Sequence, residues 1–170
     1  MRPFRADLHI HSLLSPCGSL EMSPREIIAR AIKRGLDMIA VSDHNSTYHC
    51  ELAVALGREA GITVLRAAEV TSAEDVHSLV ILPDEASTLS FQEWIDSRCA
   101  HMPHNPDIFG DQVVIDMDEN IIREVDFFLP AALNASIDEV ESAAHSRGGL
   151  FIPAHIDRPA MGILGQLGFI

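Results

Sequence analysis

The sequence predicts a single α/β domain. Apolar runs of strand length alternate along the chain with segments that carry helix-start residues and apolar residues at helical spacing, which is the pattern of α/β folds. Histidines and carboxylates follow the ends of the expected strands, and this is where sites are built in α/β barrels. With 170 residues, of which 47% are hydrophobic, the chain can bury a sizeable core and is not expected to be disordered.

The composition excludes some classes of partner. The net charge of −13 argues against non-specific binding to a nucleic-acid backbone, which needs a basic surface. It does not exclude an anionic substrate, because bound metal ions reverse the local field. No apolar run has the length of a membrane span, and the first five residues lack the apolar region of a signal peptide. The three cysteines are scattered and form no disulfide framework, so we expect a cytoplasmic protein without membrane contact.

The first expected strand covers residues 7–12. Because successive side chains of a strand point to opposite faces, Asp7, His9 and His11 should share one face, and the apolar residues between them should share the other. Two imidazoles about 7 Å apart on one strand face can hold one metal ion, with a carboxylate close by. A strand with ordinary hydrogen-bonded histidines is the alternative, and the rest of the chain decides between the two.

Local signals predict the elements that follow. Ser23, with Glu26 three residues later, starts a capped helix that Gly35 ends. The continuous apolar run 37–42 suits a strand covered by helices, and Ser90 starts a later capped helix. The expected order is a loop at 13–19, a helix at 23–35, a strand at 37–42, a helix at 48–60, strands at 62–68 and 76–82, a helix at 90–99, a polar stretch at 101–119, a short helix near 120–132, a helix from 136 to 148–149, and a strand at 150–154.

The third and fourth strands are too close in sequence for a helical crossover. Only the seven residues 69–75 separate them, whereas parallel neighbours need a dozen or more. We therefore expect a local reversal, which places Glu69 and His77 at the same rim of the sheet.

Five places in the chain then converge on one rim. They are the stretch from Asp7 to His11, the pair formed by Asp43 and His44, and three single residues further along the chain. A set of histidine and carboxylate ligands suits Mn, Zn or Fe, and a glutamate can bridge two ions about 3.5–4 Å apart, the spacing that activates water for displacement at phosphorus. The candidate metal ligands are His9, His11, Cys17, His44, Glu69, His77 and His155.

Each candidate also has an ordinary structural explanation when taken alone. Asp43 can cap a turn or fix the tautomer of His44, and Glu69 can be a solvated loop residue. His77 and His155 can be satisfied core residues, and Cys17 can be a plain loop thiol. These explanations become improbable together, because all of the residues belong to one rim.

Three residues are candidates for a catalytic role. They are Asp43, Arg158 and His104. Arg158 follows the turn at 155 and can clamp a phosphate, with a surface ion pair as the alternative. His104 belongs to the stretch 101–119, which is long for a structureless loop and is expected to be functional or partly ordered. We expect His49 on a helix surface.

The motifs resemble those of the PHP family, named for polymerase and histidinol phosphatase. The resemblance implies a distorted seven-stranded TIM-like α/β barrel, two or three divalent ions (Mn, Zn or Fe) and phosphoesterase activity on histidinol phosphate, small nucleotides or oligonucleotide ends. Where this chain has Cys17, the family often has His or Asp nearby. The family also closes its site with an Asp-x-His after the last strand, and none follows Ile170, so we expect 1–170 to be one PHP domain that lacks its C-terminal strands. The matching segments are 7–12, 42–45, 68–71, 76–77 and 153–155.

The resulting hypothesis is a hydrolase that acts on a small phosphate monoester, or on a nucleotide or oligonucleotide phosphate, by metal-activated water. One ion would bind His9, His11 and Glu69, the second Glu69, His77 and His155, and a third His44 with Cys17. Asp7 would support the site without touching metal.

Two other classes remain open. One is an amidohydrolase-type metal hydrolase, whose members often bridge two ions with a carbamylated lysine. The single lysine here, Lys33, lies in the first expected helix and away from the rim. The other is a catalytically reduced, metal-stabilised binding module.

Overall fold

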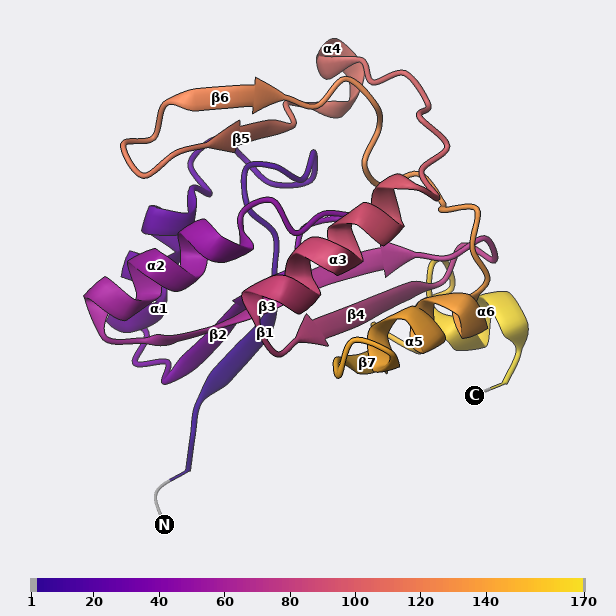
Figure 1. The fold of residues 1–170 in the computed structure, drawn as a ribbon, viewed down its shortest axis with the longest axis horizontal. Coiled ribbons are helices and arrows are strands. Elements are labelled where there is room, and N and C mark those ends of the chain that lie inside the picture. The colour runs from indigo at the N-terminus through magenta and orange to yellow at the C-terminus, as the bar shows by residue number, and fades with distance from the viewer. Residues whose placement is uncertain (1–2, 170) are drawn as a thin grey trace.

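The computed structural model describes residues 3–169 as an α/β fold built on a curved five-stranded sheet with the order β1-β2-β3-β4-β7 (Figure 1). The predicted α/β class is therefore confirmed, whereas the seven-stranded barrel is not, because the main sheet of the described residues has five strands. The strands of this sheet are β1 (Ala6–Ile10), β2 (Met38–Val41), β3 (Thr63–Thr71), β4 (His77–Leu82) and β7 (Leu150–Pro153). A separate hairpin consists of β5 (Val113–Ile115) and β6 (Ile121–Glu124). The helices are α1 (Pro24–Lys33), α2 (Cys50–Ala60), α3 (Glu85–Asp96), α4 (Pro106–Phe109), α5 (Ile137–His145) and α6 (Ile163–Leu167).

The direction of the strands brings several strand ends to one edge. β1, β2 and β3 are parallel, β4 is antiparallel to β3, and β7 is antiparallel to β4. The predicted reversal between β3 and β4 is thus confirmed. The carboxyl ends of β1, β2, β3 and β7 and the amino end of β4 consequently lie at the same edge, which we call the site edge.

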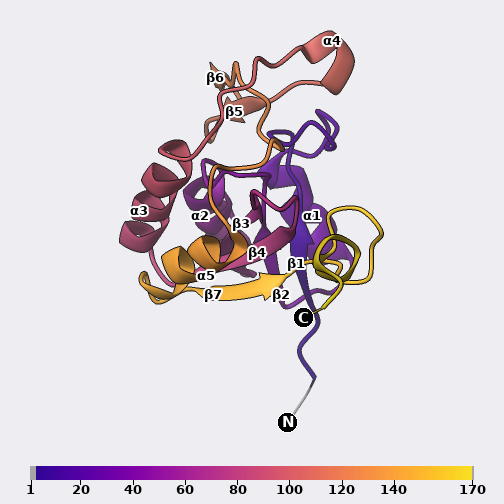
Figure 2. The same cartoon turned by 90° about the vertical axis from the view of Figure 1, so that its right-hand side faces the viewer.

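Helices α1, α2, α3 and α5 cover one face of the sheet. Ile39 and Val41 of β2 pack with α1 and α2, while Val70 and Val80 of the neighbouring strands pack with α3 and α5. Figure 2 shows α3 and α5 together on one side of the sheet, with the loop after β7 on the other. The opposite, inner face carries a smaller apolar cluster that includes Leu79. Because side chains alternate along a strand, Glu69 and His77 lie on this inner face at the site edge.

Strand β1 departs from the expected alternation. Its pairing with β2 shifts register between Asp7 and Ile10. Leu8 consequently packs in the inner cluster, whereas Ile10 packs with α1 and α2 on the outer face, so the prediction that the two share a face is wrong. Irregular pairing of this kind re-aims side chains and is common beside active sites.

Side-chain caps explain four of the six helix starts among the described residues. Ser23 caps α1 by accepting a hydrogen bond from the backbone N–H of Glu26, and Ser136 and Glu139 form the complete capping box of α5. Helix α3 begins earlier than predicted, because Asp84 and not Ser90 is its cap. The carboxylate of Asp84 accepts a hydrogen bond from the N–H of Ser87.

Two further predictions are wrong. The expected helix near 120–132 is strand β6 followed by irregular chain, because the Asp116 carboxylate accepts hydrogen bonds from the N–H groups of Asp118 and Asn120 and thereby forms the turn of a hairpin. The expected strand at 62–68 ends too early, because β3 continues to Thr71 and therefore includes Glu69. Among residues 3–169, no helix combines the length and apolarity that crossing a bilayer would require. Ile170 lies outside the described residues.

Candidate metal centre

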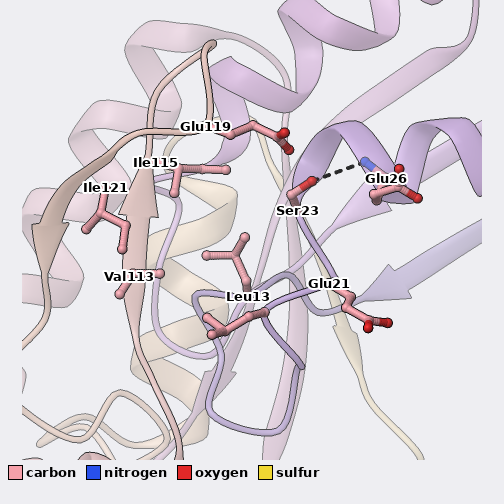
Figure 3. Close-up of a pocket in the computed structure, with 9 residues that line it drawn as sticks. Leu13, Glu21, Ser23, Glu26, Val113, Ile115, Glu119 and Ile121 are labelled. Atoms are coloured by element: carbon pink, nitrogen blue, oxygen red, sulfur yellow. Dashed lines mark hydrogen bonds between the residues drawn. The ribbon is translucent and has the colours of Figure 1, made fainter.

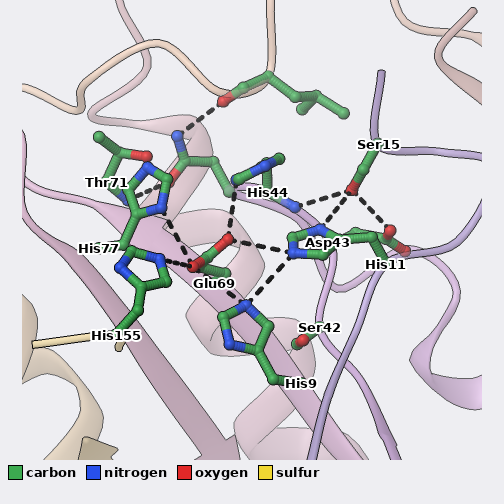
Figure 4. A network of polar contacts seen from close by, with 12 residues as sticks. His9, His11, Ser15, Ser42, Asp43, His44, Glu69, Thr71, His77 and His155 are labelled. Carbon is green, nitrogen blue, oxygen red and sulfur yellow. Dashed lines mark hydrogen bonds and ion pairs between the residues drawn. The ribbon is translucent and has the colours of Figure 1, made fainter. Parts of the chain in front are cut away.

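The centre of the site is the carboxylate of Glu69, whose side chain is only 2% exposed. Five imidazoles from four different parts of the chain surround it (Figure 4). Oε1 lies 3.0 Å from Nε2 of His9, 3.1 Å from Nδ1 of His77 and 3.1 Å from Nε2 of His155. Oε2 lies 3.2 Å from Nε2 of His11 and 3.2 Å from Nδ1 of His44.

The backbone of the site edge explains this convergence. β2 continues beyond Val41 as a single bridge in which His44 pairs with Glu69, and Asn45 donates its N–H to the carbonyl of Glu69. The antiparallel register of β3 and β4 pairs Thr71 with His77, which brings the imidazole of His77 next to the carboxylate.

His155 reaches the site from the turn after β7. It has a φ of 27°, a conformation that side-chain-bearing residues adopt rarely and that costs free energy. This strained backbone is held by the fold, since the N–H of Ala154 donates to the carbonyl of His77 and the N–H of Arg158 donates to the carbonyl of His155.

The electrostatics follow from one buried anion among five imidazoles. Burial acts to raise the pKa of Glu69, but hydrogen bonds from His11, His77 and His9 outweigh it and hold that pKa far below the usual range. Burial acts to lower the pKa of His11, whereas hydrogen bonds to Cys17 and Glu69 raise it to about 10. Burial and the charge of His11 lower the pKa of His44 to about 3. Glu69 is therefore ionised over the whole physiological pH range.

The donor set fits divalent ions. Within residues 3–169, three groups have their ligand atoms within 4.8 Å of one another. The groups are His9 with His11 and Glu69, His44 with Glu69 and His77, and His11 with Cys17 and His44. Imidazoles, a carboxylate and one thiol suit Zn and its first-row neighbours.

One buried nitrogen atom supports this fit. Nδ1 of His44 is buried and has no hydrogen-bond partner among the described residues, although it lies 3.2 Å from Oε2 of Glu69. Buried polar atoms are normally satisfied, so an unsatisfied ring nitrogen beside a carboxylate is a place where an ion would be stabilised.

The site opens into a cavity of about 510 Å³. Its lining includes all seven sequence-predicted ligands together with Arg158 and Met161. The structure thus brings one predicted catalytic residue, Arg158, to the same cavity. The exposed thiol of Cys17 also lies there.

The other predicted site residues lie elsewhere. His104 belongs to the segment beside the hairpin, where its Nε2 lies 2.7 Å from the carbonyl of Gly110 and its ring stacks near Phe128. It does not line the cavity. Asp7 is exposed, and its carboxylate accepts a long hydrogen bond of 3.4 Å from the N–H of His9. Asp7 therefore contacts the site through the backbone.

Asp43 lies beneath the ligands and is 2% exposed. Its carboxylate accepts hydrogen bonds of 2.7 Å from the N–H of Ser12, from Oγ of Ser12 and from Oγ of Ser15. Burial acts to raise its pKa, but the contacts with His49, Ser12 and Ser15 lower it below the usual value. Asp43 and His44 point to different partners, since the imidazole of His44 faces Glu69.

Sequence reasoning missed three residues of this lower layer. Ser12 and Ser15 are fully buried against Asp43, and His49 is 1% exposed and not on a helix surface as predicted. Nδ1 of His49 lies 2.8 Å from Oγ of Ser12, and its Nε2 accepts a hydrogen bond from the N–H of Ile115. The serine that directly follows His11 was a sequence signal for this layer, whereas the contact with β5 had none.

A second cavity of about 400 Å³ lies between the hairpin and the start of α1 (Figure 3). It has an apolar floor, three carboxylates and none of the candidate ligand histidines. Its lining consists of Leu13, Leu20, Glu21, Ser23, Glu26, Val113, Ile115, Glu119 and Ile121. This cavity is therefore separate in composition from the candidate metal centre.

This chain is similar to several known proteins. A family model described as PHP domain matches residues 7–126. An uncharacterized protein of Methanocaldococcus jannaschii is 31% identical over 102 residues, which cover 54% of this chain and 59% of that protein. The chain thus spans less than two thirds of the length of this relative.

Two solved structures have the same fold. A protein of Bifidobacterium adolescentis, assigned as a metal-dependent phosphoesterase, is similar with a TM-score of 0.67 at 20% identity, over 93% of this chain and 69% of the other. A lesion-specific endonuclease from Pyrococcus furiosus is similar with a TM-score of 0.66 at 22% identity, over 94% of this chain and 36% of the other. At these identities the similarity shows the fold alone.

Proposed function

Since this chain belongs to the PHP domain family, we propose that it is a metal-dependent phosphoesterase that hydrolyses a phosphate ester in the cavity above Glu69. The observation that carries the proposal is the single buried carboxylate with five imidazole nitrogens at 3.0–3.2 Å. A buried anion with so many nitrogen donors suits the binding of more than one divalent ion.

The ligand assignment follows the three groups of neighbouring donor atoms. His9 and His11 would hold one ion with Glu69, and His77 would hold a second with the same carboxylate. His155 completes the surroundings of the second ion, since its Nε2 lies 3.1 Å from Oε1 of Glu69, the same oxygen that Nδ1 of His77 approaches. Cys17 and His44 would hold a third. When bound, Mn, Zn or Fe supplies activation of water and offsets negative charge at phosphorus.

The chain's own residues account for substrate binding. Arg158 lines the same cavity as the ligands, and a guanidinium forms paired, charge-assisted hydrogen bonds with phosphate oxygens. Because the chain carries a net charge of −13, the positive guanidinium of Arg158 in this cavity is needed to attract a phosphate. Glu69 is held ionised and can therefore act as a shared anionic ligand, while Asp43 lies beneath the site and acts through its serine contacts.

The substrate we propose is a small phosphate monoester or the phosphate of a nucleotide or oligonucleotide. The similarity to an endonuclease structure supports the second class only through the fold. The acidic composition supports the first, because it disfavours a long polyanion.

The test uses metal-free protein that is reloaded with Mn²⁺ and assayed with p-nitrophenyl phosphate and bis-p-nitrophenyl phosphate, which separate monoester from diester hydrolysis. His9→Ala should lose activity. His145→Ala is the matched control, because His145 is an exposed histidine that pairs only loosely with Glu141, 3.9 Å away. If the wild-type protein holds no metal, and wild type and His9→Ala are equally inactive, the proposal is wrong. If metal binds without any ester hydrolysis, the chain is a metal-stabilised binding module.

An amidohydrolase with a carbamylated lysine between its ions does not fit. Lys33 is the single lysine of the sequence, and it is exposed in the last turn of α1, outside the lining of the cavity. A lysine-free amidohydrolase would be revealed by hydrolysis of amides or lactones in the same assay.

A further inference from the structure

A continuous chain of hydrogen bonds connects the β5–β6 hairpin to one of the candidate ligands, His11. Five groups form this chain, which we call the positioning relay. The relay consists of the N–H of Ile115, the imidazole of His49, the hydroxyl of Ser12, the carboxylate of Asp43 and the hydroxyl of Ser15. Figure 4 shows its last part, where Ser15 lies between Asp43 and His11.

The first step fixes the protonation of His49. The backbone N–H of Ile115 donates to Nε2 of His49 at 3.1 Å, and a backbone amide nitrogen cannot accept. Nε2 of His49 must therefore be the unprotonated nitrogen of a neutral ring, and the proton must be on Nδ1. Nδ1 lies 2.8 Å from Oγ of Ser12, so it donates to that hydroxyl.

The second step fixes both serine hydroxyls. Ionised Asp43 only accepts, and it takes the single hydroxyl proton of Ser12 on Oδ2 and that of Ser15 on Oδ1, both at 2.7 Å. The N–H of Ser12 also donates to Oδ1, so the carboxylate, which is 2% exposed, has three protein donors. Each serine oxygen can then act only as an acceptor toward its remaining neighbours.

The third step reaches His11. Oγ of Ser15 accepts a hydrogen bond from the N–H of His44 at 3.1 Å, and it also lies 3.2 Å from Nδ1 of His11. Because the proton of Ser15 is already donated to Asp43, Nδ1 of His11 must be the donor and must carry a proton. Only Nε2 of His11 is then free to change its state, and this atom lies 3.2 Å from Glu69 and 3.2 Å from Nε2 of His9.

We propose that the positioning relay keeps a proton on Nδ1 of His11, so that His11 can bind a divalent cation through Nε2 alone. The proposal deepens the proposed function and rests on it for the role of the cation. Asp43, Ser15 and His49 are thereby positioning residues, which act on the site through His11 without contact with substrate. Hydrogen bonds of this kind to the far nitrogen of a ligand histidine orient the ring and strengthen the ligand.

The test has one readout that needs no activity. Protein with ¹⁵N-labelled histidine is studied by NMR, with correlations from ring carbon protons to both ring nitrogens, first metal-free and then loaded with Zn²⁺. In both states Nδ1 of His11 should carry a proton, and Zn²⁺ should change the signal of Nε2 only. An unprotonated or zinc-bound Nδ1 would overturn the proposal. If Zn²⁺ does not bind at all, the proposed function fails, while the metal-free spectrum still tests the relay.

Variants separate positioning from simple packing. Ser15→Ala removes the acceptor for His11 and should weaken Zn²⁺ binding by roughly 10–100-fold, with Nδ1 of His11 no longer uniformly protonated. His49→Leu should weaken binding in the same direction, whereas His49→Asn, which can still donate to Ser12, should restore part of the loss. Thermal unfolding confirms that each variant is folded. Wild-type Zn²⁺ affinity and an unchanged His11 signal in folded Ser15→Ala or His49→Leu would contradict the relay.

Discussion

The replacement Asp43→Asn tests the layer beneath the site through stability. Asp43 is fully buried and accepts three hydrogen bonds, all from Ser12 and Ser15. Asparagine has the same shape, but its amide group must face at least one of these donors in either orientation. One charge-assisted hydrogen bond is then lost, and the other two become neutral hydrogen bonds. Hydrogen bonds to charged groups contribute about 1.5–3 kcal/mol, and neutral ones about 0.5–1.5 kcal/mol. The replacement should therefore cost about 3–5 kcal/mol of folding free energy.

The pH dependence of this cost gives a second check. The folded-state pKa of Asp43 lies below its ordinary value of 3.8, so its contribution to stability is fully present above that value and is lost as the pH falls through the lower folded pKa. Urea unfolding of metal-free wild type and Asp43→Asn should differ by the full amount at pH 7, and the difference should shrink toward acid pH. A difference below about 1 kcal/mol at pH 7, or one that grows on acidification, would refute the reasoning.

Three further outcomes follow from the site. Glu69→Gln keeps the size of the side chain but removes the shared anion. Because breaking a buried charge pair costs about 3–5 kcal/mol, Zn²⁺ affinity measured by competition with a chelating dye should fall by at least about 100-fold. An unchanged affinity would exclude Glu69 as a ligand. At Zn²⁺ concentrations about 100 times Kd, binding should add about 2.7 kcal/mol and raise Tm by roughly 5–11 °C in wild type, and an equal rise in Glu69→Gln would place the ion elsewhere. Burial raises the pKa of the Cys50 thiol to about 12, whereas Cys17 is exposed. Mass spectrometry after treatment of the native protein with iodoacetamide at pH 8 should therefore find Cys17 alkylated and Cys50 unmodified. Zn²⁺ should slow the alkylation of Cys17 if Cys17 is a ligand.

Much of the fold could be predicted because local signals agreed with the tertiary structure. Ser23 and Ser136 start helices where their capping geometry requires it. The short connection after Glu69 permitted only a reversal, and a reversal places Glu69 and His77 at one edge, as the structure does. The convergence of the histidines could be predicted for the same reason, because each lies close to the site-edge end of a strand.

The rest depends on contacts that sequence spacing does not carry. The shift of register in β1 separates Leu8 from Ile10, and alternation alone could not predict it. His49 belongs to a helix start, where an exposed side chain is the usual expectation, yet the N–H of Ile115, 66 residues away, determines its role. The hairpin was missed because its turn depends on hydrogen bonds that the Asp116 carboxylate accepts from the N–H groups of Asp118 and Asn120.

The most direct measurement is a titration of metal-free protein with Mn²⁺ in which bound metal and phosphate release from p-nitrophenyl phosphate are followed in the same sample. The account predicts that phosphate release rises with bound metal and saturates once the ions at Glu69 are in place, and that Glu69→Gln shows neither binding nor release at the same concentrations. Phosphate release that does not depend on bound metal, or metal bound at full occupancy in wild type without any release of phosphate, would contradict the central claim.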